Sequence, residues 1–147
     1  MVNPNDDDIV YVDYTDESML QEIQTLVAKD LSEPYSVFTY RYFLHNWPSL
    51  CVCAYAKAGE KEEKGEMIAV IVCKADVERD CMRGYMAMLA VSKTHRNRGI
   101  GLKVSYLCWQ LFLRIYTLKA QKSVCNHPSI RCLQLETVLY NDLLLQQ

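Results

Sequence analysis

The sequence predicts a single α/β domain in which helices cover both faces of a β-sheet. Residues 67–74 and 85–92 are almost continuous apolar runs, which is typical of central strands buried on both faces. Residues 18–30 instead place apolar side chains three and four positions apart, which is the pattern of an amphipathic helix. A chain of 147 residues is long enough to bury one sizeable core, and no internal repeat or interdomain linker interrupts it.

The N-terminal part of the chain predicts a strand followed by a helix. Residues 9–14, IVYVDY, are rich in β-branched and aromatic residues and predict the strand. Ser18 and Gln21 match the S-x-x-Q pattern, in which each side chain satisfies a free backbone N–H at the start of a helix. We therefore expect a helix from Ser18 to about Asp30. Pro34 ends this region, because the residue before a proline avoids helical geometry.

The rest of the chain predicts a second helix, three strands, a third helix and a short final strand. The second helix covers residues 38–47 and is stopped by Pro48. The three strands are expected at residues 50–56, 67–74 and 85–92. The charged segment 57–66 is expected to lie in solvent. A helix should begin after Gly99 to Gly101, and a strand at residues 132–137 should follow it.

Composition excludes several classes of protein. A formal net charge of −2 argues against a dedicated nucleic-acid-binding protein, which would be strongly basic. The apolar segment 102–118 contains Lys103, Gln110 and Arg114 and falls at the short end of the ~17–25 residues that span a bilayer. We expect a buried helix, or an unfolded apolar tail, rather than a membrane span. The N-terminus is acidic and has no apolar stretch typical of a signal peptide.

The cysteines predict a reducing compartment. The chain has seven cysteines, an odd number, and none form a C-x-x-C pair, so we expect neither a disulfide framework nor a metal site. Cys51, Cys53 and Cys73 lie inside apolar runs and are expected to be buried thiols. The predicted location is therefore the cytoplasm.

The segment Arg96-Asn97-Arg98-Gly99-Ile100-Gly101 predicts an anion-binding loop. It follows an apolar strand and precedes a helix, so backbone N–H groups at the helix N-terminus would face a bound phosphate. The third glycine of a dinucleotide-binding motif would fall on Val104, and no G-K-[ST] of a Walker loop is present. Taken alone, the pattern fits an exposed basic turn equally well.

The residues around this loop resemble a known family. MLAVSKTHRNRGIG resembles the acetyl-coenzyme A signature of the GNAT N-acetyltransferase superfamily. KDLSEPYSVFTYRYFLHNWPSLC (29–51), IVCKAD and RGYMAMLAV resemble one branch of it, the catalytic subunit of the NatC N-terminal acetyltransferase. The likeness runs from about Tyr11 to Gly101. We therefore expect one GNAT domain over residues 1–147, with a divergent part at 102–147.

The resemblance implies a mixed β-sheet that splays open between its fourth and fifth strands, with acetyl-CoA in the gap. The main chain of the fourth strand would hold the acetyl and pantetheine groups, at Met88, Leu89, Ala90 and Val91. The glycine loop would hold the pyrophosphate, through Arg96, Asn97, Arg98, Gly99, Ile100 and Gly101. No metal is implied.

The resemblance also implies an activity and a substrate. The family acetylates the α-amino group of nascent chains that begin with Met and a large apolar residue. Glu33 and Tyr35 would grip the substrate N-terminus, and Leu31, Tyr35 and Phe38 would form a hydrophobic wall for its first two residues. Without the resemblance, Glu33 would be read as an exposed loop acid.

Glu136 is the predicted general base. Leu135-Glu136-Thr137 reproduces a tripeptide of the NatC branch in which the Glu takes this role, although a short match also fits an ordinary exposed strand residue. A free α-amino group has a pKa of ~7.7–8.0, so one carboxylate, acting directly or through water, suffices as base. The segment between Gly101 and Leu135 matches the family poorly. We also expect the general-acid tyrosine and the last strands of the family to be missing.

The family further implies partners. These are a large scaffold subunit, a small Sm-like subunit and the ribosome, with no direct nucleic-acid or membrane binding. The alternative function is a truncated, inactive variant that binds acetyl-CoA or the scaffold subunit without turnover. Of 18 acidic residues, 16 lie at or before position 80, so the C-terminal part differs in composition from the rest, which keeps this alternative open.

Overall fold

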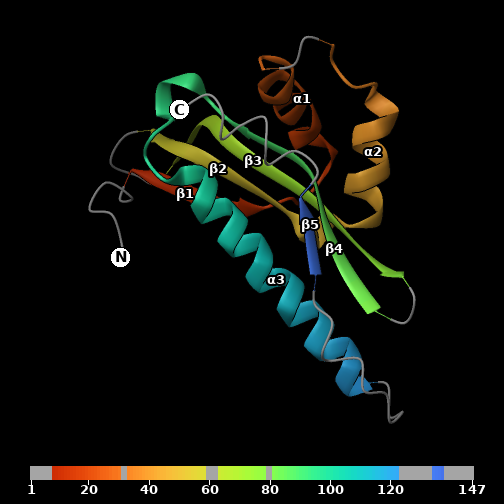
Figure 1. The fold of residues 1–147 in the computed structure, drawn as a ribbon. Coiled ribbons are helices and arrows are strands. Elements are labelled where there is room, and N and C mark those ends of the chain that lie inside the picture. Colours follow the sequence, from red (N-terminus) through yellow and green to blue (C-terminus); the bar gives the residue numbers. More distant parts are fainter. Residues whose placement is uncertain (1–7, 31–32, 59–62, 79–80, 123–133, 138–147) are drawn as a thin grey trace.

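Five strands form one mixed sheet in the order in which they occur in the chain (Figure 1). The computed structural model describes residues 8–30, 33–58, 63–78, 81–122 and 134–137. The strands are β1 Ile9–Asp13, β2 Cys51–Ala58, β3 Glu63–Glu78, β4 Cys81–Val91 and β5 Gln134–Thr137. Neighbours from β1 to β4 are antiparallel, whereas β5 runs parallel to β4. The mixed sheet expected from the resemblance is confirmed.

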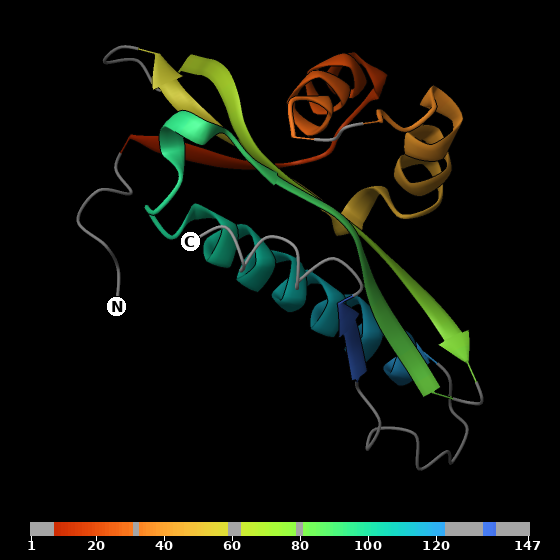
Figure 2. The same cartoon turned by 45° about the horizontal axis from the view of Figure 1, so that its top comes forward.

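Helices cover both faces of this sheet (Figure 2). Helices α1, Leu20–Ala28, and α2, Val37–Asn46, lie on one face, and α3, Ile100–Lys122, lies on the other. Because β4 and β5 are parallel, the chain must cross from one end of the sheet to the other between them, and α3 makes that crossing. Short 3-10 turns occur at Glu17–Met19, Pro48–Leu50 and Lys93–His95.

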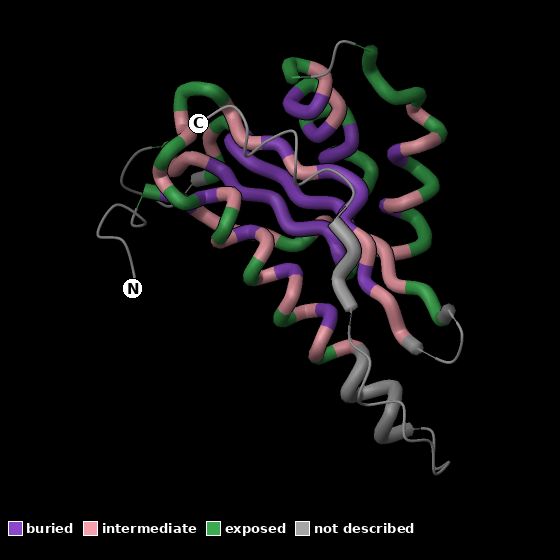
Figure 3. Tube along the Cα trace, viewed as in Figure 1, coloured by how far each residue is buried: buried purple, intermediate pink, exposed green. Residues whose placement is uncertain are grey.

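The central parts of β2, β3 and β4 are apolar, and both faces of the sheet are buried there (Figure 3). Along β2, Cys51, Cys53 and Tyr55 pack under α1 and α2, while Val52 and Ala54 pack under α3. Most of β3 and β4 shows the same alternation, as the two-residue period of a strand requires, but it is interrupted at Ile68–Ala69 and at Ala87–Met88. The predicted central strands are confirmed.

The predicted thiols are buried and free. Cys51, Cys53 and Cys73 are buried and unpaired, as is Cys108 on α3. Hydrogen bonding to Cys108 and burial both raise the pKa of the Cys73 thiol far above its usual range. In the part of the chain that the structure describes, no group of His, Cys, Asp or Glu side chains could hold a metal ion.

The predicted capping of the first helix by Ser18 and Gln21 is wrong. The carboxylate of Asp16 accepts a hydrogen bond of 2.8 Å from the backbone N–H of Ser18, and this lowers the pKa of Asp16. A 3-10 turn therefore forms first, and α1 begins only at Leu20. Asp16 thus accepts from the backbone N–H of Ser18, which the predicted pattern assigns to the side chain of Gln21.

The charged connection between β2 and β3 is shorter than predicted. The strands extend to Ala58 and from Glu63, so the predicted loop 57–66 is partly strand. At Gly65 the two strands come so close that an added Cβ would lie 2.6 Å from the carbonyl oxygen of Ala56. Register shifts on either side of Tyr55 accompany this close approach.

The apolar segment after Gly101 is a buried helix. Ile100, Val104, Cys108 and Phe112, four residues apart, pack against the sheet. The opposite face of α3 is exposed, at Leu102, Tyr106, Gln110 and Arg114. No helix among the described residues is long and apolar enough to cross a membrane. The predicted strand at 132–137 is found as β5 over Gln134–Thr137, and residues 138–147, where the last strands were expected to be missing, lie outside the described part.

Candidate functional site

The loop Arg96–Gly101 joins the end of β4 to the start of α3. Two of its residues have a positive φ, namely Asn97 at 62° and Gly99 at 76°. The carbonyl of Gly99 accepts the first helical bond, from Lys103 at 3.0 Å, so α3 begins directly after Gly99. The N–H groups of the first helical turn then have no partner within the helix. This arrangement suits a bound phosphate, as the sequence predicts.

Both glycines leave open space beside the backbone. A Cβ added at Gly99 would meet nothing within 4 Å, and one added at Gly101 would make ordinary contact with Val91 at 3.6 Å. Packing within the protein therefore does not explain either glycine. Gly99 is explained by its left-handed backbone, which a side chain would strain.

The two predicted phosphate-binding arginines are both paired with carboxylates. Arg98 donates from Nη2 to the two carboxylate oxygens of Asp8, at 2.7 and 2.8 Å. This hydrogen bond lowers the pKa of Asp8. Arg96 donates to Asp30 at 2.5 Å. The positive charge of the loop is therefore partly neutralised, and the backbone N–H groups and the helix end carry more of the anion attraction than the sequence suggests.

The predicted pantetheine segment forms the C-terminal end of β4. Among the described residues, β5 pairs with β4 only from Arg83 to Met86. Ala87 follows as a bulge, because Val72 pairs with Met88 and Cys73 pairs with Met86. Beyond the bulge, the main chain of Met88, Leu89, Ala90 and Val91 forms the rest of β4. Bulges bend a strand and re-aim the residues beside it, so Ala87 separates the part of β4 that pairs with described residues of β5 from the predicted pantetheine segment.

Glu136 lies in β5, directly opposite Tyr85 of β4. Tyr85 is in turn opposite Lys74 of β3, whose Nζ lies 5.5 Å from the centre of the tyrosine ring. Sequence reasoning missed both residues. The alignment of IVCKAD and RGYMAMLAV with the family includes them, but only the register places them next to Glu136. The side chain of Glu136 itself lies outside the described part.

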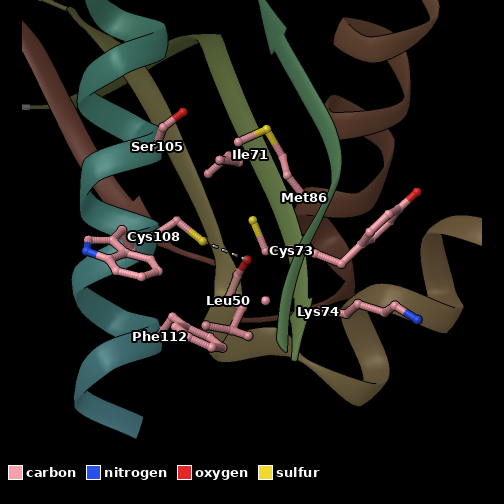
Figure 4. A pocket seen from close by; sticks show the side chains of 11 residues that line it. Leu50, Ile71, Cys73, Lys74, Met86, Ser105, Cys108 and Phe112 are labelled. Carbon is pink, nitrogen blue, oxygen red and sulfur yellow. Dashed lines mark hydrogen bonds between the residues drawn. The ribbon is translucent and has the colours of Figure 1, made fainter. Parts of the chain in front are cut away.

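The pocket between α3 and the sheet is part of the core rather than a ligand site (Figure 4). Figure 4 shows Cys73, Met86, Cys108 and Phe112 around it, with Cys108 donating to the carbonyl of Leu50 at 3.6 Å. Its lining is almost entirely apolar. Lys74 points away from α3, toward the face of the sheet covered by α2, so that face is the one that can receive a polar substrate.

Of the predicted peptide-binding residues, Glu33 and Tyr35 lie between α1 and α2, and Phe38 lies in the first turn of α2. Leu31 lies outside the described part, and Glu33 is exposed. The ring of Tyr35 meets the ring of Tyr40 edge-on, with the ring centroids 6.2 Å apart. The side chain of Phe38 is 75% exposed to solvent. Sequence reasoning missed Tyr40, whose buried hydroxyl has no hydrogen-bond partner among the described residues. Burial raises its pKa.

Comparison with known proteins decides the family. Residues 20–135 match the acetyltransferase (GNAT) family. The chain belongs to this family. The GNAT fold expected from the sequence is thereby confirmed. The residues assigned to the acetyl-CoA signature and the boundary near Gly101 between a family-like and a divergent part stay predictions.

Similar proteins also support the NatC branch of the GNAT family. The chain is 50% identical to N-alpha-acetyltransferase 30 of Xenopus laevis over 98 residues, which are 66% of this chain and 33% of that protein. It is 48% identical to the human protein of the same name over 102 residues, 68% of this chain and 26% of that one. N-alpha-acetyltransferase MAK3 of Arabidopsis thaliana is 47% identical over 93 residues, 63% of this chain and 45% of that protein. The chain thus spans between a quarter and half of the length of these relatives.

A solved GNAT structure agrees with this placement. The crystal structure of the NatC complex bound to Gag peptide and CoA matches with a TM-score of 0.67 and 36% identity, covering 95% of this chain and 80% of that one. The predicted resemblance to the NatC catalytic subunit is confirmed. Arabidopsis thaliana Naa50, in complex with a bisubstrate analogue, matches with a TM-score of 0.58 and 16% identity over 71% of this chain and 64% of that one, which supports the fold alone.

Proposed function

We propose that this chain is a NatC-like N-terminal α-amino acetyltransferase, which transfers acetyl from acetyl-CoA to protein N-termini that begin with Met and a large apolar residue. The observation that carries the proposal is the order of features after Met86, where the last residues of β4 lead into a loop with positive φ at the start of α3. A pantetheine arm and a pyrophosphate need these two features in this order along the chain. The relatives named N-alpha-acetyltransferase 30 support acetylation of an α-amino group, while the choice of Met followed by a large apolar residue rests on the resemblance of the sequence.

Acetyl-CoA fits the residues that are present. The pyrophosphate would take the backbone N–H groups between Asn97 and Gly101, where the space beside Gly99 is open. The pantetheine amides would bond to the main chain of Met88–Val91. The thioester would then lie near the bulge at Ala87, between β4 and β5.

The reaction we propose is a direct transfer. The neutral α-amine attacks the thioester carbonyl carbon, a C–N bond forms, the C–S bond breaks, and the coenzyme A thiolate leaves. Glu136 would accept the first proton, lost by the substrate ammonium, and release it to solvent. The nitrogen loses its second proton as the amide forms, and the thiolate takes up one proton, directly or through water. Glu136 holds the register position next to Tyr85. General base catalysis of this kind contributes about 10²–10⁴-fold to the rate.

The substrate N-terminus would enter on the face of the sheet that carries α1 and α2. Glu33 and Tyr35 precede α2, and the exposed ring of Phe38 offers apolar surface there. With Leu31, they would select a Met-Leu type of N-terminus. A scaffold subunit, a small Sm-like subunit, the ribosome and a cytoplasmic location complete the proposal. The NatC complex structure that this chain resembles supports assembly with other subunits, while the ribosome and the cytoplasm rest on the resemblance of the sequence.

The test is acetylation of a Met-Leu peptide by the purified 147-residue chain, with and without the scaffold subunit. We expect turnover, and we expect Glu136→Gln to lower kcat by about 10²-fold or more while CoA binding, measured by calorimetry, is retained. A Ser-Glu peptide is the substrate control. CoA binding without turnover would favour the inactive variant, and a folded chain that does not bind CoA would refute the proposal.

A further inference from the structure

Asp30 lies just beyond the C-terminal end of α1, where a carboxylate gains nothing from the helix. Its backbone N–H bonds to the carbonyl of Val27 at 3.3 Å, so the residue sits at the negative end of the helix dipole, which disfavours an anion. Its side chain is nevertheless only 25% exposed. The contacts that hold a carboxylate in this position must come from elsewhere in the fold.

Those contacts come from the segment between β4 and α3. Arg96 donates from Nη2 to a carboxylate oxygen of Asp30 at 2.5 Å, although 66 residues separate the two in the chain. Lys93 also approaches, with its Nζ 4.0 Å from the other carboxylate oxygen. The side chain of Lys93 is 73% exposed and that of Arg96 is 30% exposed, so solvent screens the lysine more strongly. Arg96 is therefore the main partner of Asp30.

Arg96 makes a second contact that ties this ion pair to the sheet. Its Nε donates to the carbonyl of Val91, the last residue of β4, at 3.1 Å. One guanidinium group thus joins three places: the end of β4, the first residue of the glycine loop, and the end of α1. The charged partner makes the contact to Asp30 stronger than a neutral hydrogen bond. A planar guanidinium holds its donors in a fixed geometry, so the three places keep a fixed relative position.

We infer that the Arg96–Asp30 ion pair is a positioning contact that couples the acetyl-CoA loop to the peptide-binding segment after α1. The inference rests on the proposed function, which places CoA at the loop and the peptide beside Glu33 and Tyr35. Arg96 is then a positioning residue as well as a member of the loop. By linkage, CoA strengthens peptide binding by the same factor by which peptide strengthens CoA binding.

The test measures this factor directly. CoA is used in place of acetyl-CoA because it carries no acetyl group and cannot react. Its dissociation constant is determined by calorimetry on the 147-residue chain, with and without a saturating Met-Leu peptide. We expect peptide to tighten CoA binding by a factor of about 5 or more, within the range of about 5–150 usual for coupled sites. Asp30→Asn is isosteric and removes the charge. In this variant, the ratio of the CoA dissociation constants without and with peptide should fall close to 1, while CoA alone still binds. Asp30→Glu should restore part of the coupling.

Asp8→Asn is the matched control. Asp8 pairs with Arg98 in the same loop through two hydrogen bonds, but it precedes β1 and has no part in the peptide segment. This variant should keep the coupling of the wild type. Arg96→Lys keeps the charge but cannot bridge Val91 and Asp30, so it should lose the coupling, and it serves as the test if Asp30→Asn does not fold. Thermal unfolding of every variant reports the fold.

The outcomes separate the inference from the proposed function. Coupling that persists in Asp30→Asn and Arg96→Lys, or that is lost equally in Asp8→Asn, would overturn the inference. A wild-type ratio of 1, with CoA and peptide both bound, would overturn it as well and leave the proposed function standing. A folded wild-type chain that binds no CoA would remove the proposed function itself.

Discussion

The two glycines of the Arg96–Gly101 loop should respond to alanine with opposite changes in stability. Gly99 has a φ of 76°, and an added Cβ would meet no atom within 4 Å. Gly99→Ala therefore has no steric clash with its surroundings, and its whole cost is that of a left-handed backbone. This cost is about 1–2 kcal/mol for a residue with a side chain.

Gly101 is the second residue of α3 and its φ is not positive, and an added Cβ would only contact Val91 at 3.6 Å. Gly101→Ala removes the entropic cost of glycine in a helix, which is at most about 1 kcal/mol. We expect the unfolding free energy to fall by about 1–2 kcal/mol for Gly99→Ala and to rise by up to about 1 kcal/mol for Gly101→Ala.

Thermal and urea unfolding of both variants beside the wild type would measure these changes. For a chain of this size, about 1 kcal/mol shifts Tm by about 2–4 °C, so the expected shifts are about −2 to −8 °C for Gly99→Ala and up to about +4 °C for Gly101→Ala. Shifts of the same sign would refute the reasoning from φ. An unchanged Tm for Gly99→Ala would show that the loop does not hold this backbone in the free protein.

Two further predictions concern the core and the acid limit of stability. Phe112 is 4% exposed and packs against Gly84, so Phe112→Ala should lower the unfolding free energy by about 3–5 kcal/mol. Leu102, on the opposite face of the same helix, is 69% exposed, so Leu102→Ala should change the unfolding free energy by no more than about 0.5 kcal/mol. Urea unfolding would measure both, and equal losses would contradict the packing of α3. The hydrogen bond from Arg98 lowers the pKa of Asp8 in the folded state, so its stabilising contribution is present above the unfolded pKa of ~3.9 and is lost as the pH falls through the lower folded pKa. The stability difference between wild type and Asp8→Asn should therefore be constant from pH 7 to 5 and shrink below pH 4, and a difference that did not change with pH would contradict this.

Much of the fold could be predicted because its signals are local. The apolar runs at 67–74 and 85–92 predict central strands, and β3 and β4 contain them. The glycine loop was placed correctly between β4 and α3, because Gly99 and Gly101 mark a turn in any context. The helix cap was predicted incorrectly because the carboxylate of Asp16 takes the backbone N–H of Ser18, which the S-x-x-Q pattern assigns to the side chain of Gln21.

The sequence by itself determined the order of the elements, the position of the loop and the resemblance to the acetyltransferase (GNAT) family, since each depends on residues close together in the chain. The tertiary structure alone decided which carboxylates face Arg96 and Arg98, because those partners lie 66 and 90 residues away. It also decided the bulge at Ala87 and the pairing of Glu136 with Tyr85. Strand register and the crossing of α3 set these contacts, and both result from how whole elements pack, which no local pattern of residues encodes.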